Sequence, residues 1–129
     1  MSALPVRPAV LVVEDESLVR MYATDVLEDA GYEVIEAGNA QQALAQLEAR
    51  PDIDVIFTDI NMPGDMDGFA LAREVHKRRP GIHLILTSGR MRLDRAAVPE
   101  AVAFMPKPYT AEKLTGLLNS VLSEPSLSA

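Results

Sequence analysis

The sequence contains no cysteine, and it has no apolar run approaching the roughly 18 residues that a membrane-spanning helix needs. Without cysteine, a disulfide-stabilised secreted scaffold and thiol chemistry are both excluded. The first residues, MSALPVRP, lack the basic and apolar regions of a signal peptide. Positive charge is also scarce, and no basic run could neutralise the phosphates of a nucleic acid. We therefore expect a soluble cytoplasmic protein that binds neither nucleic acid nor a membrane.

The length and composition favour one globular domain. The chain has 129 residues, and dividing it would leave two pieces too small for good cores. Hydrophobic residues make up 48% of it, which excludes a disordered acidic chain. The net charge of −7 suits cation binding and simple solubility equally well. We expect the domain to span residues 8–123, with loose tails at 1–7 and 124–129.

Short apolar runs bounded by polar residues, glycine or proline predict five β-strands. Several of them are almost continuously apolar, as expected for strands that are covered on both faces. The predicted strands are AVLVV (9–13), EVIEA (33–37), IDVIF (53–57), LILTS (84–88) and VAFM (102–105).

Stretches with helical periodicity separate these strands. Asn39 and Thr110 are expected to cap the second and the last helix, and the third is expected to run from about Gly68 to Arg79. Segment 90–100 is rich in arginine and interrupted by Pro99, so a helix there should be short or irregular. The first helix should bury one apolar stripe and stop at Gly31; the stripe consists of Leu18, Val19, Tyr22, Val26 and Leu27.

This alternation predicts an α/β fold with a doubly wound, five-stranded parallel sheet. Pro106 cannot donate to a sheet ladder, which favours an edge position for the fifth strand. The flavodoxin-like strand order 2-1-3-4-5 meets this condition. It also places a topological switch point, where such sheets bind ligands, between the first and third strands.

Chemically active side chains follow the strands that meet at this switch point. Glu14 and Asp15 end the first strand and Asp59 ends the third, so three carboxylates should converge and repel one another. A bound divalent cation resolves this repulsion, and an all-oxygen site suits Mg²⁺. The fourth strand, which ends in Thr87 and Ser88, would add a hydroxyl, and Lys107 after the fifth strand would add an ammonium. Together these groups could stabilise a phosphoryl group on an aspartate.

The motifs LVVEDE, FTDINMPGDMDG, LTSG and PKPY stand in this order at the predicted strand ends. Over roughly residues 8–123 the sequence resembles a response-regulator receiver domain of two-component signalling, of the stand-alone, single-domain type. The resemblance implies that Asp59 accepts phosphate from a phosphohistidine on a sensor histidine kinase or a histidine phosphotransfer protein. It also implies that Mg²⁺ is held by Glu14, Asp15 and Asp59, together with the backbone carbonyl of Asn61.

The same resemblance implies how phosphorylation would be transmitted. Ser88 would hydrogen-bond the phosphoryl group, Lys107 would pair with it, and Phe104 would be the rotating aromatic switch residue. The Lys107–Pro108 bond would be cis. The domain would then alter the binding of an unidentified downstream protein through the fourth strand, the fifth strand and the last helix. We expect no output domain in the chain, and no enzymatic activity beyond assistance with its own phosphorylation and dephosphorylation.

Three features depart from the family pattern. The loop 63–68 has one residue more than the usual MPxMDG motif, because Gly64 and Asp65 stand where one residue is common. Thr87 competes with Ser88 as the switch hydroxyl, and Ser88 is favoured because a small residue follows it directly. Segment 90–100 departs from the regular fourth helix of the family.

The same residues also suggest other kinds of site and other functions, some of which the sequence excludes. A calcium loop at 59–70 fails, because Pro63 occupies a ligand position and Ala70 stands where a bidentate glutamate is needed. A phosphatase of the haloacid-dehalogenase type needs a second aspartate where Asn61 stands. A pseudo-receiver that binds partners without phosphorylation remains an alternative. Glu14 and Asp15 could also simply favour a helix N-terminus, and Phe104 could be a plain core residue.

Overall fold

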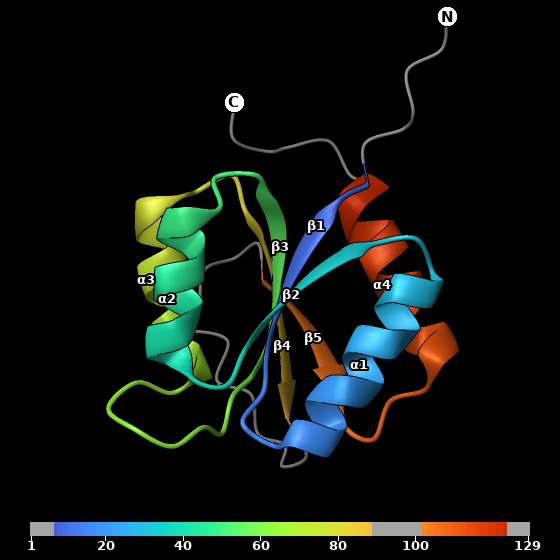
Figure 1. Ribbon diagram of the computed structural model, residues 1–129, viewed down its shortest axis with the longest axis horizontal. Helices are drawn as coiled ribbons and strands as arrows, with labels where there is room; N and C mark the ends of the chain where they lie inside the picture. The colour runs from blue at the N-terminus through green and yellow to red at the C-terminus, as the bar shows by residue number, and fades with distance from the viewer. Residues whose placement is uncertain (1–6, 89–101, 124–129) are drawn as a thin grey trace, which may run out of the picture.

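The computed structural model describes residues 7–88 and 102–123, and within these ranges the chain alternates between strands and helices. Figure 1 shows the strands side by side at the centre of the molecule. The strands are β1 (Ala9–Val13), β2 (Glu33–Ala37), β3 (Ile53–Asp59), β4 (His83–Ser88) and β5 (Val102–Pro106). The helices are α1 (Ser17–Asp29), α2 (Ala40–Ala49), α3 (Gly68–Arg78) and α4 (Ala111–Ser123).

The five strands form one sheet of order β2-β1-β3-β4-β5, and every neighbouring pair is parallel. The predicted flavodoxin-like fold is therefore confirmed. β5 lies at the edge, where Pro106 does not interrupt a ladder on its outer side. Because β1 and β3 are neighbours and β2 lies beyond β1, the switch point falls between β1 and β3. The predicted irregular helix at 90–100 lies outside the described residues.

Helices cover both faces of the sheet and produce two apolar cores. In Figure 1, α2 and α3 lie on one side of the sheet and α1 and α4 on the other. The α2/α3 side holds a buried cluster that includes Ile56, Leu71 and Leu86, and the α1/α4 side holds one that includes Val12 and Leu118. Among the described residues, no helix is long and apolar enough to cross a membrane.

The polar residues predicted to start helices do so. The Asn39 side chain accepts a hydrogen bond from the backbone N–H of Gln42 at 2.8 Å, and Thr110 Oγ1 accepts one from the N–H of Lys113 at 3.1 Å. Both contacts satisfy donors that the first helical turn leaves without a partner in the helix. Gly31, with φ of 97°, follows α1 in the left-handed conformation that glycine tolerates best.

The predicted buried stripe of α1 is partly wrong. Leu18 is 79% exposed and Tyr22 45% exposed, whereas the buried residues of the helix are Ala23, Thr24 and Leu27. At 3.6 residues per turn, the face centred on these three residues is rotated by about a quarter turn from the apolar stripe. The buried face of α1 therefore carries two small side chains beside Leu27, and several larger apolar side chains remain at the surface.

Candidate functional site

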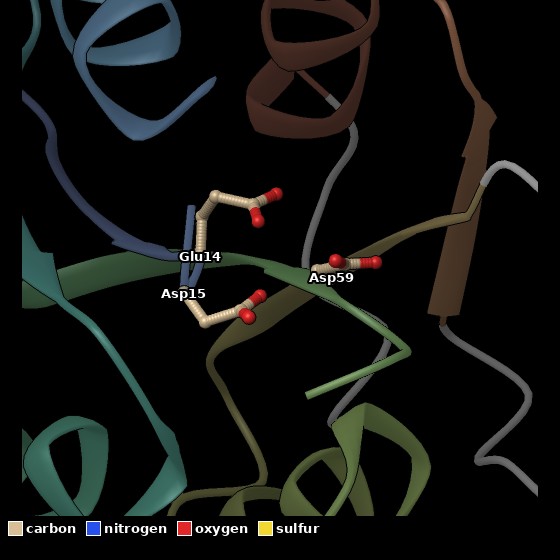
Figure 2. A group of neighbouring side chains, drawn as sticks. All are labelled: Glu14, Asp15 and Asp59. Carbon is tan, nitrogen blue, oxygen red and sulfur yellow. The ribbon is translucent and has the colours of Figure 1, made fainter. Parts of the chain in front are cut away.

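Three carboxylates gather where β1 and β3 end. Glu14 and Asp15 follow Val13 directly, and Asp59 is the last residue of β3. Each can place a carboxylate oxygen within 4.8 Å of the others. Figure 2 shows Glu14 and Asp15 leaving β1 on different sides, with both carboxyl groups near the end of β3 that carries Asp59. Glu14 and Asp59 are buried, whereas Asp15 is exposed, so the cluster opens to solvent on the Asp15 side.

Lys107 joins the two buried carboxylates from the far edge of the sheet. Its Nζ lies 3.0 Å from Glu14 Oε1 and 3.3 Å from Asp59 Oδ2. The backbone N–H of Lys107 donates to the Ser88 carbonyl at 3.0 Å, which extends the pairing of β5 with β4 beyond Pro106. This backbone bond fixes where the lysine side chain begins, and the side chain then reaches across to the ends of β3 and β1.

Burial and charge shift the pKa values of this group in specific directions. Burial raises the pKa of Glu14, although the N–H of Glu16 and the ammonium of Lys107 counteract it. For Lys107, burial alone would lower the pKa, but the hydrogen bond to Glu14 and the negative charge of Asp59 outweigh it and raise the value. The lysine is therefore held in its charged form beside the carboxylates.

The backbone around Asp59 is packed tightly against the start of α3. The N–H of Gly68 donates to the Ile60 carbonyl at 2.8 Å, and a Cβ built on Gly68 would lie 2.3 Å from the carbonyl oxygen of Asp59. Only glycine allows this approach. Asp67 caps α3 by accepting from the N–H of Ala70 at 2.9 Å. These contacts fix the start of α3 next to the backbone of Asp59.

The loop 63–68 accommodates its additional residue through a glycine. Gly64 has a φ of 102°, a conformation that other residues rarely adopt. Loop residues Pro63, Gly64, Asp65 and Met66 border a cavity of about 240 Å³ together with the first residues of α2. The longer loop therefore lies beside the start of α2.

Asn61 connects Asp59 to Ser88. Its backbone N–H donates to Asp59 Oδ1 at 3.3 Å, and its side-chain Nδ2 donates to Ser88 Oγ at 3.3 Å. The family resemblance implied a role only for the Asn61 carbonyl, and the contact made by its side chain was not predicted. Thr87 Oγ1 is buried and, among the described residues, has no hydrogen-bond partner. The geometry thus links Ser88, rather than Thr87, to the acidic site.

Two aromatic positions flank the site. Phe104 is half-buried on β5 opposite Leu86 and packs against the core on the α2/α3 side. The Lys107–Pro108 peptide bond is cis, and Tyr109 follows it. The Tyr109 ring packs edge-on against Phe57, with 5.6 Å between ring centroids. Burial raises the pKa of Tyr109 to about 12.

The donor set fits a hard divalent cation. When all four groups are ionised, the three carboxylates exceed the single ammonium by two negative charges. Carboxylate oxygens are the ligands that Mg²⁺ prefers, and this cation usually keeps several water molecules. The exposed side of Asp15 leaves room for such water. Glu14, Asp15 and Asp59 are therefore suitable ligands for Mg²⁺.

Fold and site together define a class of protein. It is a flavodoxin-like α/β domain with an acidic, lysine-containing site at the carboxyl ends of its strands. The model of the family described as "Response regulator receiver domain" matches residues 10–119. The chain belongs to this family, whose members are signalling domains of two-component systems.

Characterised relatives and solved structures agree with this assignment. The chain is 36% identical over 119 residues to the sensor kinase CckA of Brucella abortus, covering 89% of this chain and 12% of the kinase. It is 33% identical over 125 residues to the transcriptional regulatory protein PdtaR of Mycobacterium tuberculosis, covering 95% of this chain and 59% of the regulator. The chain therefore spans less than two thirds of either relative.

Among solved structures, a CheY-like receiver domain protein from Methanospirillum hungatei superposes with a TM-score of 0.81 at 29% identity. That match covers 91% of this chain and 94% of the other. The receiver domain of the hybrid histidine kinase CckA superposes with a TM-score of 0.78 at 31% identity. This second match covers 89% of this chain and 99% of the CckA receiver domain. The predicted family is confirmed.

Proposed function

We propose that this domain is a Mg²⁺-dependent phosphoacceptor in which Asp59 takes a phosphoryl group from a phosphohistidine. The donor would be a histidine kinase or a histidine phosphotransfer protein. The observation that carries the proposal is the position of Asp59, which is buried at the end of β3 with Lys107 Nζ 3.3 Å from its Oδ2 and two acidic neighbours beside it. The domain would be a reactant in the transfer, not an enzyme with turnover on free substrates.

In the proposed step, an Asp59 carboxylate oxygen attacks phosphorus while the bond between phosphorus and the imidazole nitrogen breaks. The electron pair of that bond returns to the imidazole, and a phosphoaspartate forms. Asn61 orients the carboxylate through its N–H bond to Oδ1. A bound Mg²⁺, held by Glu14, Asp15, Asp59 and the Asn61 carbonyl, would supply positive charge for the phosphoryl oxygens.

Lys107 would act as the fixed cation of the site. Its two carboxylate partners raise its pKa, so its ammonium stays charged where negative charge arrives with the phosphoryl group. Before the reaction, Lys107 partly offsets the repulsion between Glu14 and Asp59. After it, the ammonium can pair with the phosphoryl group instead of the free carboxylate of Asp59.

The switch would depend on the Asn61–Ser88 contact. In the structure, Ser88 Oγ accepts from the Asn61 side chain. We propose that the hydroxyl turns to the phosphoryl group once Asp59 is modified, and that Phe104 moves into the space it leaves. This rearrangement would change the surface formed by β4, β5 and α4, where a downstream protein binds.

Phosphorylation from a small donor tests the proposal. The protein is incubated with acetyl phosphate and Mg²⁺, and its intact mass is measured. The wild type should gain one phosphoryl group, and chelation of Mg²⁺ or the Asp59→Asn substitution should prevent the gain. Asp65→Asn is the matched control, because Asp65 is exposed in the adjacent loop and should leave phosphorylation unchanged. Equal mass gain in Asp59→Asn would reject the proposal.

A further inference from the structure

Arg20 lies outside the acidic cluster and donates a hydrogen bond to the backbone of Glu14, a member of that cluster. Arg20 lies at the end of the first turn of α1, and its Nη1 donates to the Glu14 carbonyl oxygen at 2.6 Å. Its Nε donates to Glu36 Oε1 on β2 at 3.1 Å. The guanidinium therefore ties the peptide bond between Glu14 and Asp15 to the neighbouring strand.

This contact completes the fixation of the Glu14 backbone. The N–H of Glu14 donates to the Ala37 carbonyl at 3.0 Å, so β2 holds the peptide group before Glu14, and Arg20 holds the one after it. That second peptide group carries the backbone nitrogen of Asp15, so its orientation influences where the Asp15 side chain leaves the backbone. Arg20 thus restrains the one backbone unit that connects two of the three carboxylates.

Asp15 depends on this restraint more than Glu14 does. The Glu14 carboxylate is also held by Lys107 Nζ at 3.0 Å and by the Glu16 N–H at 3.1 Å. Among the described residues, the Asp15 carboxylate has no hydrogen bond or ion pair, and Asp15 is exposed to solvent. Its position therefore depends on the backbone that carries it and on its own side-chain rotamer.

We propose that Arg20 is a positioning residue for the cation site: it holds the Glu14–Asp15 peptide so that the Asp15 carboxylate faces Asp59. This inference rests on the proposed function. Arg20 is not one of the residues that would hold the cation, and its own charge opposes cation binding. Its positive charge is offset by Glu36. Positioning and charge thus have opposite effects on metal affinity, which allows them to be separated.

Two substitutions make this separation. Arg20→Met removes both the positive charge and the planar guanidinium with its N–H donors. Arg20→Lys keeps the charge, but an ammonium cannot bind the Glu14 carbonyl and the Glu36 carboxylate in the same planar geometry. If Arg20 positions Asp15, Arg20→Lys binds the cation about tenfold more weakly, which is the low end for the loss of an outer-shell partner. Arg20→Met also binds it more weakly, but by a smaller factor, because the loss of the positive charge favours cation binding. If only charge matters, Arg20→Met binds more tightly and Arg20→Lys is unchanged.

The matched control is Arg50→Met. Arg50 also forms ion pairs with two carboxylates, Glu33 and Asp52, but Glu33 begins β2 at the opposite end of the sheet. Its loss should leave the metal affinity unchanged. The affinity is measured with Mn²⁺ as the probe, by the loss of the free-ion electron paramagnetic resonance signal, and then by competition with Mg²⁺. Thermal unfolding without metal reports folding separately.

The phosphorylation rate gives a second readout. With acetyl phosphate as donor, Arg20→Lys should need more Mg²⁺ for half-maximal rate and should reach the wild-type rate at saturation. A variant that was merely less stable would not shift the Mg²⁺ dependence. Wild-type affinity in both Arg20 variants would overturn this inference and leave the phosphoacceptor proposal standing. Absence of Mn²⁺ and Mg²⁺ binding in the wild type would overturn both.

Discussion

The substitution Gly68→Ala provides a quantitative test of how the site is built. A Cβ at this position would lie 2.3 Å from the Asp59 carbonyl oxygen and 2.6 Å from the Ile60 Cα. Both atoms belong to the backbone, so no side-chain rotation can relieve the contact. Either the start of α3 or the chain after β3 must move away.

Three contributions determine how Gly68→Ala changes the free energy of unfolding. Overpacking of this kind costs about 1–3 kcal/mol or more. The hydrogen bond from the Gly68 N–H to the Ile60 carbonyl would be strained or lost, which adds about 1 kcal/mol. The greater helix propensity of alanine returns up to about 1 kcal/mol. We expect a net loss of roughly 1–4 kcal/mol in the free energy of unfolding.

Urea denaturation followed by circular dichroism measures this loss. Gly116→Ala is the matched control, because Gly116 is exposed in α4 and a Cβ there meets no atom within 4 Å. That variant should gain about 0.5–1 kcal/mol from helix propensity. If Gly68→Ala is within about 0.5 kcal/mol of wild type, the close contact does not constrain the chain beside Asp59 and our description of the loop is wrong.

Further predictions concern charge, pH and the switch. Lys107→Met should slow phosphorylation from acetyl phosphate by roughly 100-fold, the loss typical for one electrostatic donor, as followed by intact mass; an unchanged rate would remove Lys107 from the mechanism. Because burial raises the pKa of Tyr109 to about 12 from 10.0, the unfolded chain loses this proton at lower pH than the folded one. The stability of wild type relative to Tyr109→Phe should therefore fall as pH rises between about 10 and about 12 in urea titrations, and a constant difference would contradict the burial argument. Ser88→Ala should still accept phosphate but should lose any phosphorylation-dependent capture of a partner, as measured by pull-downs with and without a stable phosphoryl mimic. Intact capture would mean that other residues couple phosphorylation to partner binding.

Much of the fold followed from local patterns. The predicted strand 9–13 and the observed β1 coincide, because an apolar run between a proline and an acidic pair has few alternatives. The edge position of β5 followed from Pro106, which lacks a donor for a further strand. The convergence of Asp15 and Asp59 followed from parallel strand order, since carboxyl ends meet at one edge.

What the sequence did not predict depends on tertiary geometry. The buried face of α1 consists of Ala23, Thr24 and Leu27, and it is not the face on which the larger apolar residues gather. The contact between Lys107 and Glu14 joins residues 93 positions apart and involves a long, rotatable side chain. Arg20 reaches Glu14 and Glu36 only because β2 lies beside β1. Periodicity and motif spacing carry none of this information.

The most direct test of the central claim is chemical mapping of the phosphorylated residue. After incubation with acetyl phosphate and Mg²⁺, borohydride reduction converts a phosphoaspartate into homoserine, which peptide sequencing by mass spectrometry locates. We predict homoserine at position 59 alone, and none when Mg²⁺ is removed by chelation. Homoserine at another aspartate, or none anywhere in a folded and Mg²⁺-loaded wild-type protein, would contradict the account.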